Sequence, residues 1–427
     1  MSAESEDPAL SPEALVEAAG RRAKQVAPLV GALPTGVKND VLHDIADTLL
    51  AESDTILAAN ERDVVSAERR RCSDSFLDHL TLTRPRLFAM AEGVRYIAAQ
   101  TDPVGEVLRG SRRPSGLVVQ EVRVPLGVVG LIYQSRPNLT IDSVSLCLKA
   151  GNAVLLLGGA FALESNRALM DVVRRATARQ GVPADATQLI ETTEPAAVDC
   201  LLHLSEYVDL LIPRGSQDLI RRVCRTATVP TIETGAGNNH VFVERTARLE
   251  MAADIALNAK VQRPGAVNSM ETLLIDAPVA ESFLTIIGPR LRAAGVELRG
   301  CPETQRLVPG VRPATEQDWE TDFQELILAV RVVNGLEEAI AHIARYGTRL
   351  SEAIVTQDYF AGRRFTERVD AAAVYVNAST RFTDGFELGL GAELGISTQK
   401  LHRRGPLGLR ALTSWKWIAY GDGQVRD

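Results

Sequence analysis

The chain has 427 residues, of which 45% are hydrophobic and 24% charged, a balance typical of a soluble globular protein with two or three domains. Its formal net charge of −7 argues against general binding to nucleic-acid backbones, and no apolar run is long enough for a membrane helix. The acidic, Ser-rich residues 1–12 resemble neither a secretory signal nor a transit peptide and are expected to form a frayed tail.

The cysteines and histidines exclude two classes of site. The five cysteines are widely spaced and form no Cys-x-x-Cys pair, which argues against a disulfide scaffold and favours the reducing cytoplasm. The six histidines show no metal-binding spacing and no HExxH motif, so the sequence predicts no metal site.

The N-terminal quarter of the chain predicts helices, because apolar side chains recur there at helical spacing. The expected helices are 14–29, 36–50, 53–67 and 83–100. The next segment, 116–123, reads as a strand and is followed by a turn at Pro125-Leu126-Gly127. A strand and turn in this place indicate a hairpin arm.

From Val128 onward, short apolar strands alternate with helices, which predicts two α/β units with parallel sheets that join near residues 233–250. The first unit is expected to contain strands 128–133, 153–157, 207–212 and 228–232 and helices 140–150, 163–180 and 217–226. The second is expected to contain helices 249–261, 279–294 and 336–346 and strands 271–276, 326–333, 352–356 and 372–377.

The common nucleotide and hydrolase signatures are absent. The sequence has no GxGxxG after a strand, no GxxxxGK[ST] and no GxSxG. The glycine-rich segment 389–395 has different spacing and no preceding strand, so it is expected to be a loop.

Two segments join the end of an expected strand to the start of a helix, where ligands bind in open α/β sheets. In 133–142 (YQSRPNLTID), Arg136 and Asn138 can hold an anion together with the free N–H groups at the start of the helix. The alternative is that Asn138 only caps the helix. In 210–220 (LLIPRGSQDLI), Gly215 and Ser216 would let a pyrophosphate approach, although an ordinary turn explains the same residues.

A third segment gathers charged residues around a glycine-proline turn. Lys260, Arg263 and Glu271 crowd the stretch NAKVQRPGAVNSMETLL (258–274), which follows IETGAGNNH (232–240). This density is unusual for a solvated turn and indicates a functional site.

Read together, these and later motifs resemble the γ-glutamyl phosphate reductase family, within the aldehyde dehydrogenases. The resemblance extends from about residue 14 to the C-terminus and rests on the segments VPLGVVGLIYQSRPNLTIDSVSLCLKAGNAVLLLGG, IPRGSQDLI, NAKVQRPG, VYVNASTRFTDG and LGAELGISTQKLHRRGPLGL.

The resemblance implies an aldehyde dehydrogenase-like α/β fold with a cofactor-binding domain, a catalytic domain and a small oligomerisation arm. The corresponding ranges are 1–115 with 128–235, 236–385, and 116–127 with the C-terminal segment 386–427. It also implies that NADPH reduces L-glutamyl 5-phosphate to L-glutamate 5-semialdehyde and phosphate, in proline biosynthesis, through a cysteine thioester. Implied partners are further copies of the chain and glutamate 5-kinase.

The chain departs from this family at the nucleophile. Between Gln262-Arg263-Pro264 and Asn268, the position of the family's cysteine is occupied by Val267, and valine has no nucleophilic atom. Leu157 stands where relatives have Arg, which is expected to weaken cofactor binding, and Asn239 stands where some relatives have Cys. No cysteine replaces the missing one: Cys147 and Cys224 read as helix core residues, and Cys72, Cys200 and Cys301 are remote from every motif.

The remaining site residues keep the roles that the resemblance and their charge imply. Asn138 is expected to stabilise the oxyanion, and Glu233 corresponds to the general base of many aldehyde dehydrogenases, or is structural. The substrate is expected to contact Arg136, Lys260, Arg263 and Arg381, and the cofactor to contact Gly158, Gly159, Arg214, Gly215 and Ser216.

Two kinds of function follow. The chain is a reductase that works without the thiol, because an acyl phosphate is activated enough to accept a hydride directly. Alternatively, it is a catalytically altered or silent paralogue that binds an acyl phosphate, a nucleotide or the partner kinase.

Overall fold

The computed structural model describes residues 11–426, apart from the side chain of Ser75, and forms two compact units. Unit 1 holds the described residues up to Glu233 together with Leu390–Gly395 and those from Leu407 onward, and unit 2 holds Thr234–Gly389 and Ile396–Pro406. Of the expected N-terminal tail, residues 1–10 lie outside the described part. None of the described helices is long and apolar enough to cross a membrane.

A four-stranded parallel sheet in the order β5-β4-β3-β6 forms the centre of unit 1. Its strands are β3 (Val128–Tyr133), β4 (Ala153–Gly158), β5 (Thr187–Leu189) and β6 (Leu210–Arg214). All six residues of β3 are buried. Alternate side chains point to opposite faces, so Leu131 packs with the cluster under α2, α5, α6 and α7, and Ile132 packs with the cluster under α1 and α8.

Helices cover both faces of this sheet. They are α1 (Pro12–Gly31), α2 (Thr35–Ala51), α3 (Ser53–Arg69), α4 (Asp74–Leu80), α5 (Arg84–Ala99), α6 (Asn138–Lys149), α7 (Leu163–Arg179), α8 (Pro195–His203) and α9 (Gln217–Thr226). The sequence specifies several starts locally: Ser11 caps α1, where Pro12 fills the first turn, and Ser216 caps α9.

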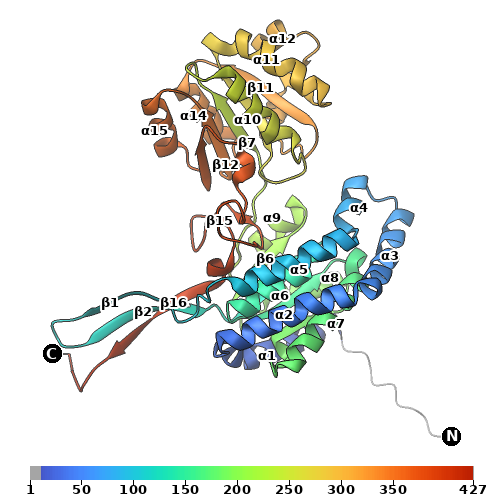
Figure 1. Ribbon diagram of the computed structural model, residues 1–427, viewed down its shortest axis with the longest axis vertical. Helices are drawn as coiled ribbons and strands as arrows, with labels where there is room; N and C mark the ends of the chain where they lie inside the picture. The colour runs from blue at the N-terminus through green and yellow to red at the C-terminus, as the bar shows by residue number, and fades with distance from the viewer. Residues whose placement is uncertain (1–10, 427) are drawn as a thin grey trace. The chain divides into compact units, whose positions relative to one another are not determined.

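Three antiparallel strands extend from the helices of unit 1 as an arm (Figure 1). They are β1 (Val107–Arg112), β2 (Val118–Pro125) and β16 (Thr413–Tyr420), with β2 in the middle. The strand expected at 116–123 is therefore present, and β16 pairs with it from Thr413 to Tyr420. Strand β1 was not predicted from the sequence.

Unit 2 is built on a seven-stranded sheet in the order β10-β9-β11-β8-β7-β12-β13, with every pairing parallel. The strands are β7 (Asn239–Val243), β8 (Met270–Asp276), β9 (Glu297–Gly300), β10 (Arg312–Pro313), β11 (Ile327–Val333), β12 (Ser351–Val355) and β13 (Ala373–Val376). A separate pair, β14 (Ile396–Ser397) and β15 (Gly405–Pro406), is antiparallel.

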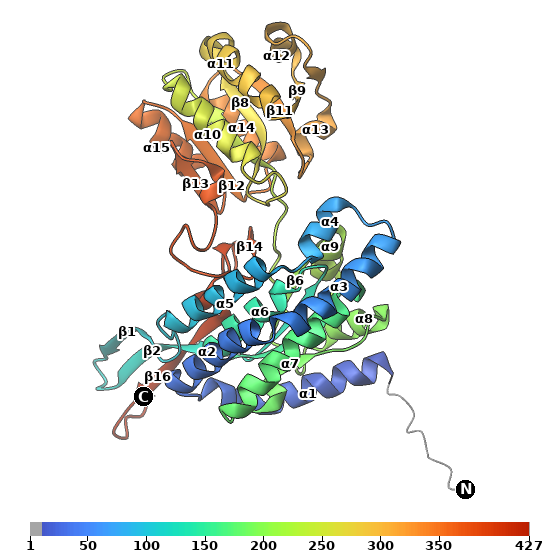
Figure 2. The ribbon, with the colours of Figure 1, turned by 45° about the vertical axis from the view of Figure 1, so that its right-hand side comes forward.

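Helices pack against the strands of unit 2, as Figure 2 shows. They are α10 (Leu249–Val261), α11 (Ala280–Ala293), α12 (Pro302–Leu307), α13 (Glu316–Glu320), α14 (Leu336–Tyr346) and α15 (Tyr359–Arg368). Val241 and Leu273 pack with α10 and α11, whereas Phe242 and Leu274 pack with α14 and α15. Both units are thus three-layered α/β structures.

The strand expectations differ from the structure in two ways: one expected strand is absent, and several short strands, including β5, β9 and β10, were not predicted. Residues 228–232 form no strand; Thr231 makes only a single bridge to Leu211, because Pro230 has no N–H with which to continue a ladder. Conversely, β7 was not predicted, since its short apolar run follows two asparagines that read as loop residues.

Candidate active site

The carboxyl ends of β3 and β6 are the part of unit 1 where a ligand is expected. From β3 the chain passes to β4 on one side and later to β6 on the other, so the strand order reverses between β3 and β6. Ligands of open parallel sheets bind outside the carboxyl ends of the strands at such a reversal. Segments 133–142 and 210–220 both leave the sheet here.

Glycines let Gln134 pack closely at these strand ends. A Cβ on Gly215, directly after β6, would lie 2.8 Å from Oε1 of Gln134, so a side chain there would displace the residue that follows β3. Gly158 ends β4, and Gly159 packs on Gln134 from the other side, its Cβ position 3.4 Å from Cα of Gln134. Ser216 caps α9, so its hydroxyl oxygen already accepts a backbone N–H of the helix.

Two arginines give these strand ends positive charge. Burial, and after it the charge of the nearby Arg136, lower the pKa of Arg214 to about 10. Nε of Arg214 is buried without a hydrogen-bond partner among the described residues, and Glu393 offsets part of the charge. Two neighbouring cations at a strand end favour a bound anion. From the sequence, Arg136 was expected to contact the substrate and Arg214 the cofactor. Their proximity suits both of them to the same anion.

Asn138 begins α6, and its carboxamide is held by a neighbour on the same helix. Nδ2 of Asn138 donates to Oδ2 of Asp142 at 3.0 Å. Burial raises the pKa of Asp142 to about 6, although the bond from Asn138 favours the carboxylate. One amide N–H of Asn138 is thus fixed and the other is available.

Two further positions of unit 1 that the sequence singled out are Leu157 and Glu233. Leu157 is only 3% exposed and packs in the apolar cluster of α1 and α8. Glu233, the last residue of the first segment of unit 1, lies near Cys224, whose thiol pKa is raised by burial and by the charge of Glu233.

In unit 2, Val267 lies in the loop that precedes β8. Asn239, at the start of β7, is buried, and its Nδ2 lies 2.9 Å from the carbonyl oxygen of Val267 and 2.6 Å from that of Ser269. Nδ2 of Asn268 donates to the carbonyl of Thr383 at 2.7 Å. The main chain on each side of Val267 is therefore tied down.

The Lys260 ammonium is engaged within the core. Its Nζ lies 2.6 Å from Oε2 of Glu271, and both side chains are completely buried. Burial lowers the pKa of Lys260 and raises that of Glu271 to about 8. A phosphate reaches Lys260 only if this pair opens, which argues against the direct substrate contact expected from the sequence.

Arg263 and Arg381 lie close together beside the same loop. The pKa of Arg381 is lowered by burial and then by the charge of Arg263, and its Nε donates to Oε1 of Gln262 at 2.8 Å. Arg263 is exposed. These two cations flank the Val267 loop and can hold the anionic groups of a substrate.

Comparison with known proteins decides the family. The sequence matches the aldehyde dehydrogenase family over residues 6–305. It is 55% identical over 406 residues to the γ-glutamyl phosphate reductase of Carboxydothermus hydrogenoformans, covering 95% of this chain and 98% of that protein. The chain belongs to the γ-glutamyl phosphate reductase family. It is also 53% identical over 412 residues to the enzyme of Moorella thermoacetica, covering 96% of this chain and 99% of the relative.

A solved structure of the γ-glutamyl phosphate reductase family has the same fold. The crystal structure of the Thermotoga maritima protein has a TM-score of 0.94 and 43% identity, covering 96% of this chain and 100% of that one. The family and the aldehyde dehydrogenase-like fold predicted from the sequence are confirmed. The role of each residue in the γ-glutamyl phosphate reductase site stays a prediction.

Asp142 was not found from the sequence, and the contacts of Asn239 and Glu271 were not expected from it. Asp142 follows Asn138 at the spacing of one helical turn, a signal that sequence reasoning could have used. Asn239 contacts a loop that is distant in sequence, and Glu271 was noticed without its pairing to Lys260. Only the fold brings these partners together.

Other chemistry in the described part of the chain is limited. All five cysteines are free thiols, and burial raises the pKa of Cys147 far above its usual range, so it is a core residue as expected. No group of three or more His, Cys, Asp or Glu among the described residues could hold a metal ion.

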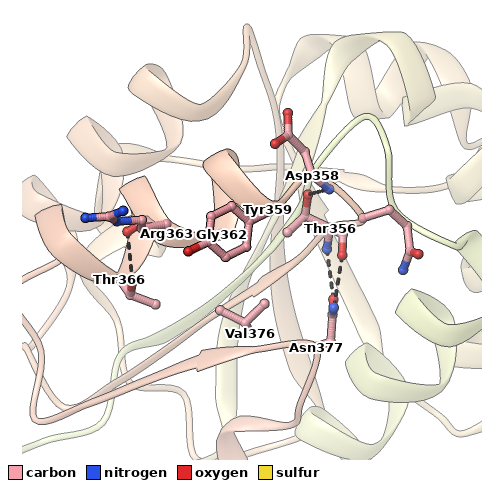
Figure 3. Close-up of a pocket in the computed structure, with 9 residues that line it drawn as sticks. Thr356, Asp358, Tyr359, Gly362, Arg363, Thr366, Val376 and Asn377 are labelled. Carbon is pink, nitrogen blue, oxygen red and sulfur yellow. Dashed lines mark hydrogen bonds between the residues drawn. The ribbon is translucent and has the colours of Figure 1, made fainter.

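A separate hollow of unit 2 lies at the carboxyl ends of β12 and β13 (Figure 3). Its volume is about 460 Å³, and Tyr359, Val376 and Asn377 line it. Asn377 bridges to the backbone of Thr356 through two hydrogen bonds of 2.9 Å. The Val267 loop precedes β8 and so lies at the amino end of a parallel strand, whereas this hollow lies at the carboxyl ends of β12 and β13 and is distinct from the candidate site.

Proposed function

We propose that this chain binds L-glutamyl 5-phosphate and NADPH and reduces the acyl phosphate to L-glutamate 5-semialdehyde, with release of phosphate. The observation that carries the proposal is identity of 53–55% over at least 95% of the chain to proteins named γ-glutamyl phosphate reductase. The positions of the charged side chains support it.

The proposed substrate carries an anion at each end, an α-carboxylate and a phosphate. Arg263 and Arg381 form a pair of cations beside the Val267 loop, which suits one of these anions. Asn138 supplies an amide N–H for the oxygen that becomes negative as the acyl carbon is attacked. We propose no catalytic role for Glu233, because the reduction of an acyl phosphate needs no general base to activate water.

The residues at the β3–β6 strand ends fit a nicotinamide dinucleotide. The topological reversal, the lack of a side chain at Gly215 and the unpartnered Nε of Arg214 suit a phosphorylated ligand there. Gly158, Gly159, Arg214, Gly215 and Ser216 would hold it. When bound, NADPH supplies the hydride.

With valine at position 267, the proposed reaction proceeds without a thioester. The hydride adds to the acyl carbon, the bond from that carbon to the phosphate oxygen breaks, and phosphate leaves with the bonding electrons. Loss of the covalent route raises the barrier by several kcal/mol, so we expect turnover about a hundredfold or more below that of a cysteine-containing variant.

A second candidate is a silent paralogue that binds acyl phosphate or nucleotide without reducing it. The observation that favours it is the half-buried Val267 side chain, together with the lack of a described cysteine in the adjoining loop. Binding of both ligands without turnover would support this alternative.

We also infer that the chain is a homo-oligomer, because the three-stranded arm exposes large apolar side chains that an isolated small sheet cannot bury. The kinase that makes L-glutamyl 5-phosphate is a proposed partner, because an acyl phosphate hydrolyses readily once it is released. The proposed location is the cytoplasm, which suits five free thiols.

The test is NADP⁺ reduction in the reverse direction, with glutamate 5-semialdehyde and phosphate, by the natural protein and by V267C, V267S and V267A. We expect slow turnover by the natural protein and a gain of about a hundredfold in V267C alone. V267A controls for the change in volume and V267S for polarity without a strong nucleophile. No turnover by any variant, with both ligands bound, would favour the silent paralogue.

A further inference from the structure

The loop that carries Val267 is fixed by its main chain. Two turn-type bonds fold it locally, from the N–H of Ala266 to the carbonyl of Arg263 (3.0 Å) and from that of Ser269 to the carbonyl of Ala266 (2.9 Å). Oγ of Ser269 also donates to the carbonyl of Ala259 at 3.2 Å. None of these bonds uses the side chain at position 267.

Asn239 makes the direct contact with residue 267. Its Nδ2 lies 2.9 Å from the carbonyl oxygen of Val267, 2.8 Å from that of Gly237 and 2.6 Å from that of Ser269. Its Oδ1 accepts the N–H of Ser351 at 3.1 Å. Every polar atom of the carboxamide is thus used, which fixes its orientation at the edge of β7.

The backbone around Asn239 is shaped for this contact. The pairing of β7 with β8 is irregular between Asn239 and His240, where Asn239 is opposite Met270 and His240 opposite Thr272. A Cβ on Gly237 would lie 1.5 Å from the carbonyl oxygen of Val267, so only glycine permits this approach. Irregular pairing of this kind often redirects residues next to active sites.

The side chain of Val267 takes no part in this arrangement. It is half-buried and belongs to none of the apolar clusters formed by the described residues. Asn239, by contrast, is completely buried. The conformation of the loop therefore does not depend on which side chain stands at position 267.

We propose that Asn239 is a positioning residue that fixes the main chain of residue 267, so that any side chain placed there is presented in one orientation. The inference rests on the proposed function, since it assigns Asn239 to the same site. It explains how the loop keeps its geometry although the nucleophile is absent.

The test uses V267C as a reporter, because a thiolate at position 267 can be followed by its reaction with iodoacetamide. The variant N239D has nearly the same shape, but its ionised carboxylate cannot donate to the three carbonyl oxygens. The matched control is N238D, because Nδ2 of Asn238 also donates to two carbonyls, those of Trp319 (2.7 Å) and Tyr346 (2.9 Å), neither of them in the Val267 loop.

Mass spectrometry gives the alkylation rate of Cys at position 267 as a function of pH, with circular dichroism to confirm folding. We expect V267C/N239D to react with a shifted pH profile and a rate changed by about tenfold, and V267C/N238D to keep the profile of V267C. V267C/N239S, which retains a small donor, should lie between them and serves if N239D does not fold. Equal effects of N239D and N238D, or no effect of either, would overturn the proposal.

Reductase activity is measured separately on the same variants. If the thiol of V267C responds to Asn239 as expected but no variant reduces the acyl phosphate, the proposed function fails and the positioning role stands. If V267C is an active reductase and N239D leaves its thiol reactivity unchanged, the positioning role fails and the proposed function stands.

Discussion

Asn138 donates a hydrogen bond to Asp142, one turn further along α6, at 3.0 Å between Nδ2 and Oδ2. The carboxylate fixes the plane of the carboxamide and polarises its remaining N–H, which is the group that would meet a developing oxyanion. An anionic acceptor is stronger than a neutral one, so Asp142 should act on the reaction through Asn138.

We therefore expect D142A, in the V267C background, to lower kcat by about tenfold with little change in KM, because the carboxamide loses its anchor. D142N keeps a neutral acceptor and should recover part of the rate. Steady-state kinetics check this, with D171N on the surface of α7 as a control. Equal losses of kcat in D142A and D142N would contradict a positioning role.

The same carboxyl group makes stability depend on pH. Burial raises the pKa of Asp142 from its ordinary value of 3.8 to about 6, so the folded protein holds this proton more tightly than the unfolded chain does. Its contribution to the unfolding free energy is present at low pH and is lost as the pH rises through this window. D142N has no carboxyl group to ionise and should not lose this stability. Urea unfolding between pH 4 and about pH 7 should therefore show that the unfolding free energy of D142N, relative to that of the natural protein, is greater at pH 7 than at pH 4.

Arg214 is expected to bind the cofactor through charge. R214Q should weaken NADPH binding by about tenfold, because a buried guanidinium beside a second cation makes a charge-assisted bond to phosphate. R225Q, an exposed arginine on the adjoining helix α9, is the matched control and should change little. Calorimetry with NADPH and with inorganic phosphate checks both. Weaker phosphate binding with NADPH unaffected would assign Arg214 to the substrate instead.

The sequence predicted the sheets of the two units better than their site contacts. Runs such as 128–133 and 153–157 contain no charged residue because both faces of a parallel strand are covered, and they could be recognised without a partner. Short strands at the sheet edges, such as β10 with two residues, carry too little pattern to be seen. The run 228–232 shows the opposite error, since Pro230 removes a donor that a strand requires.

Charge alone misled the prediction for Lys260. A lysine beside a glycine-proline turn suggested an accessible cation, whereas the fold turns its ammonium inward to Glu271. The charge of Arg136 and Arg214 could be read from the sequence, but their proximity could not. They are neighbours in the fold although they are far apart in the sequence. Pairings of this kind depend on strand order, which local periodicity does not specify.

The exposed apolar side chains of the three-stranded arm predict that copies of the chain associate. Trp415 and Trp417 are 53% and 57% exposed on β16, and residues two apart in a strand share a face. We expect the natural protein to be oligomeric at micromolar concentration and W415E to weaken association by about tenfold or more, because a carboxylate would be buried in the contact. Light scattering and sedimentation check this, with L401E, at an 85% exposed leucine of unit 2, as the control. A monomeric natural protein would contradict the prediction.

The last prediction concerns the buried pair of Lys260 and Glu271. K260M leaves the Glu271 carboxyl buried without its cation, and above the pKa of about 8 of this carboxyl the broken pair costs about 3–5 kcal/mol of unfolding free energy. The double variant K260M/E271M should recover most of this loss, because two apolar side chains of similar volume replace two buried charges. K400M removes the same side chain from an exposed pair with Asp370, 62% and 46% exposed, and should cost no more than about 1 kcal/mol.

The pH dependence adds an independent check on this pair. Burial raises the pKa of Glu271 from 4.5 to about 8, so its contribution to stability is present at low pH and is lost as the pH rises towards 8. K260M should extend this loss to higher pH, because the cation that favours the carboxylate is gone. Urea unfolding at pH 6 and about pH 9 should therefore show a larger penalty for K260M at the higher pH. Equal penalties for K260M and K400M at both values would mean that the pair contributes nothing beyond an ordinary surface contact.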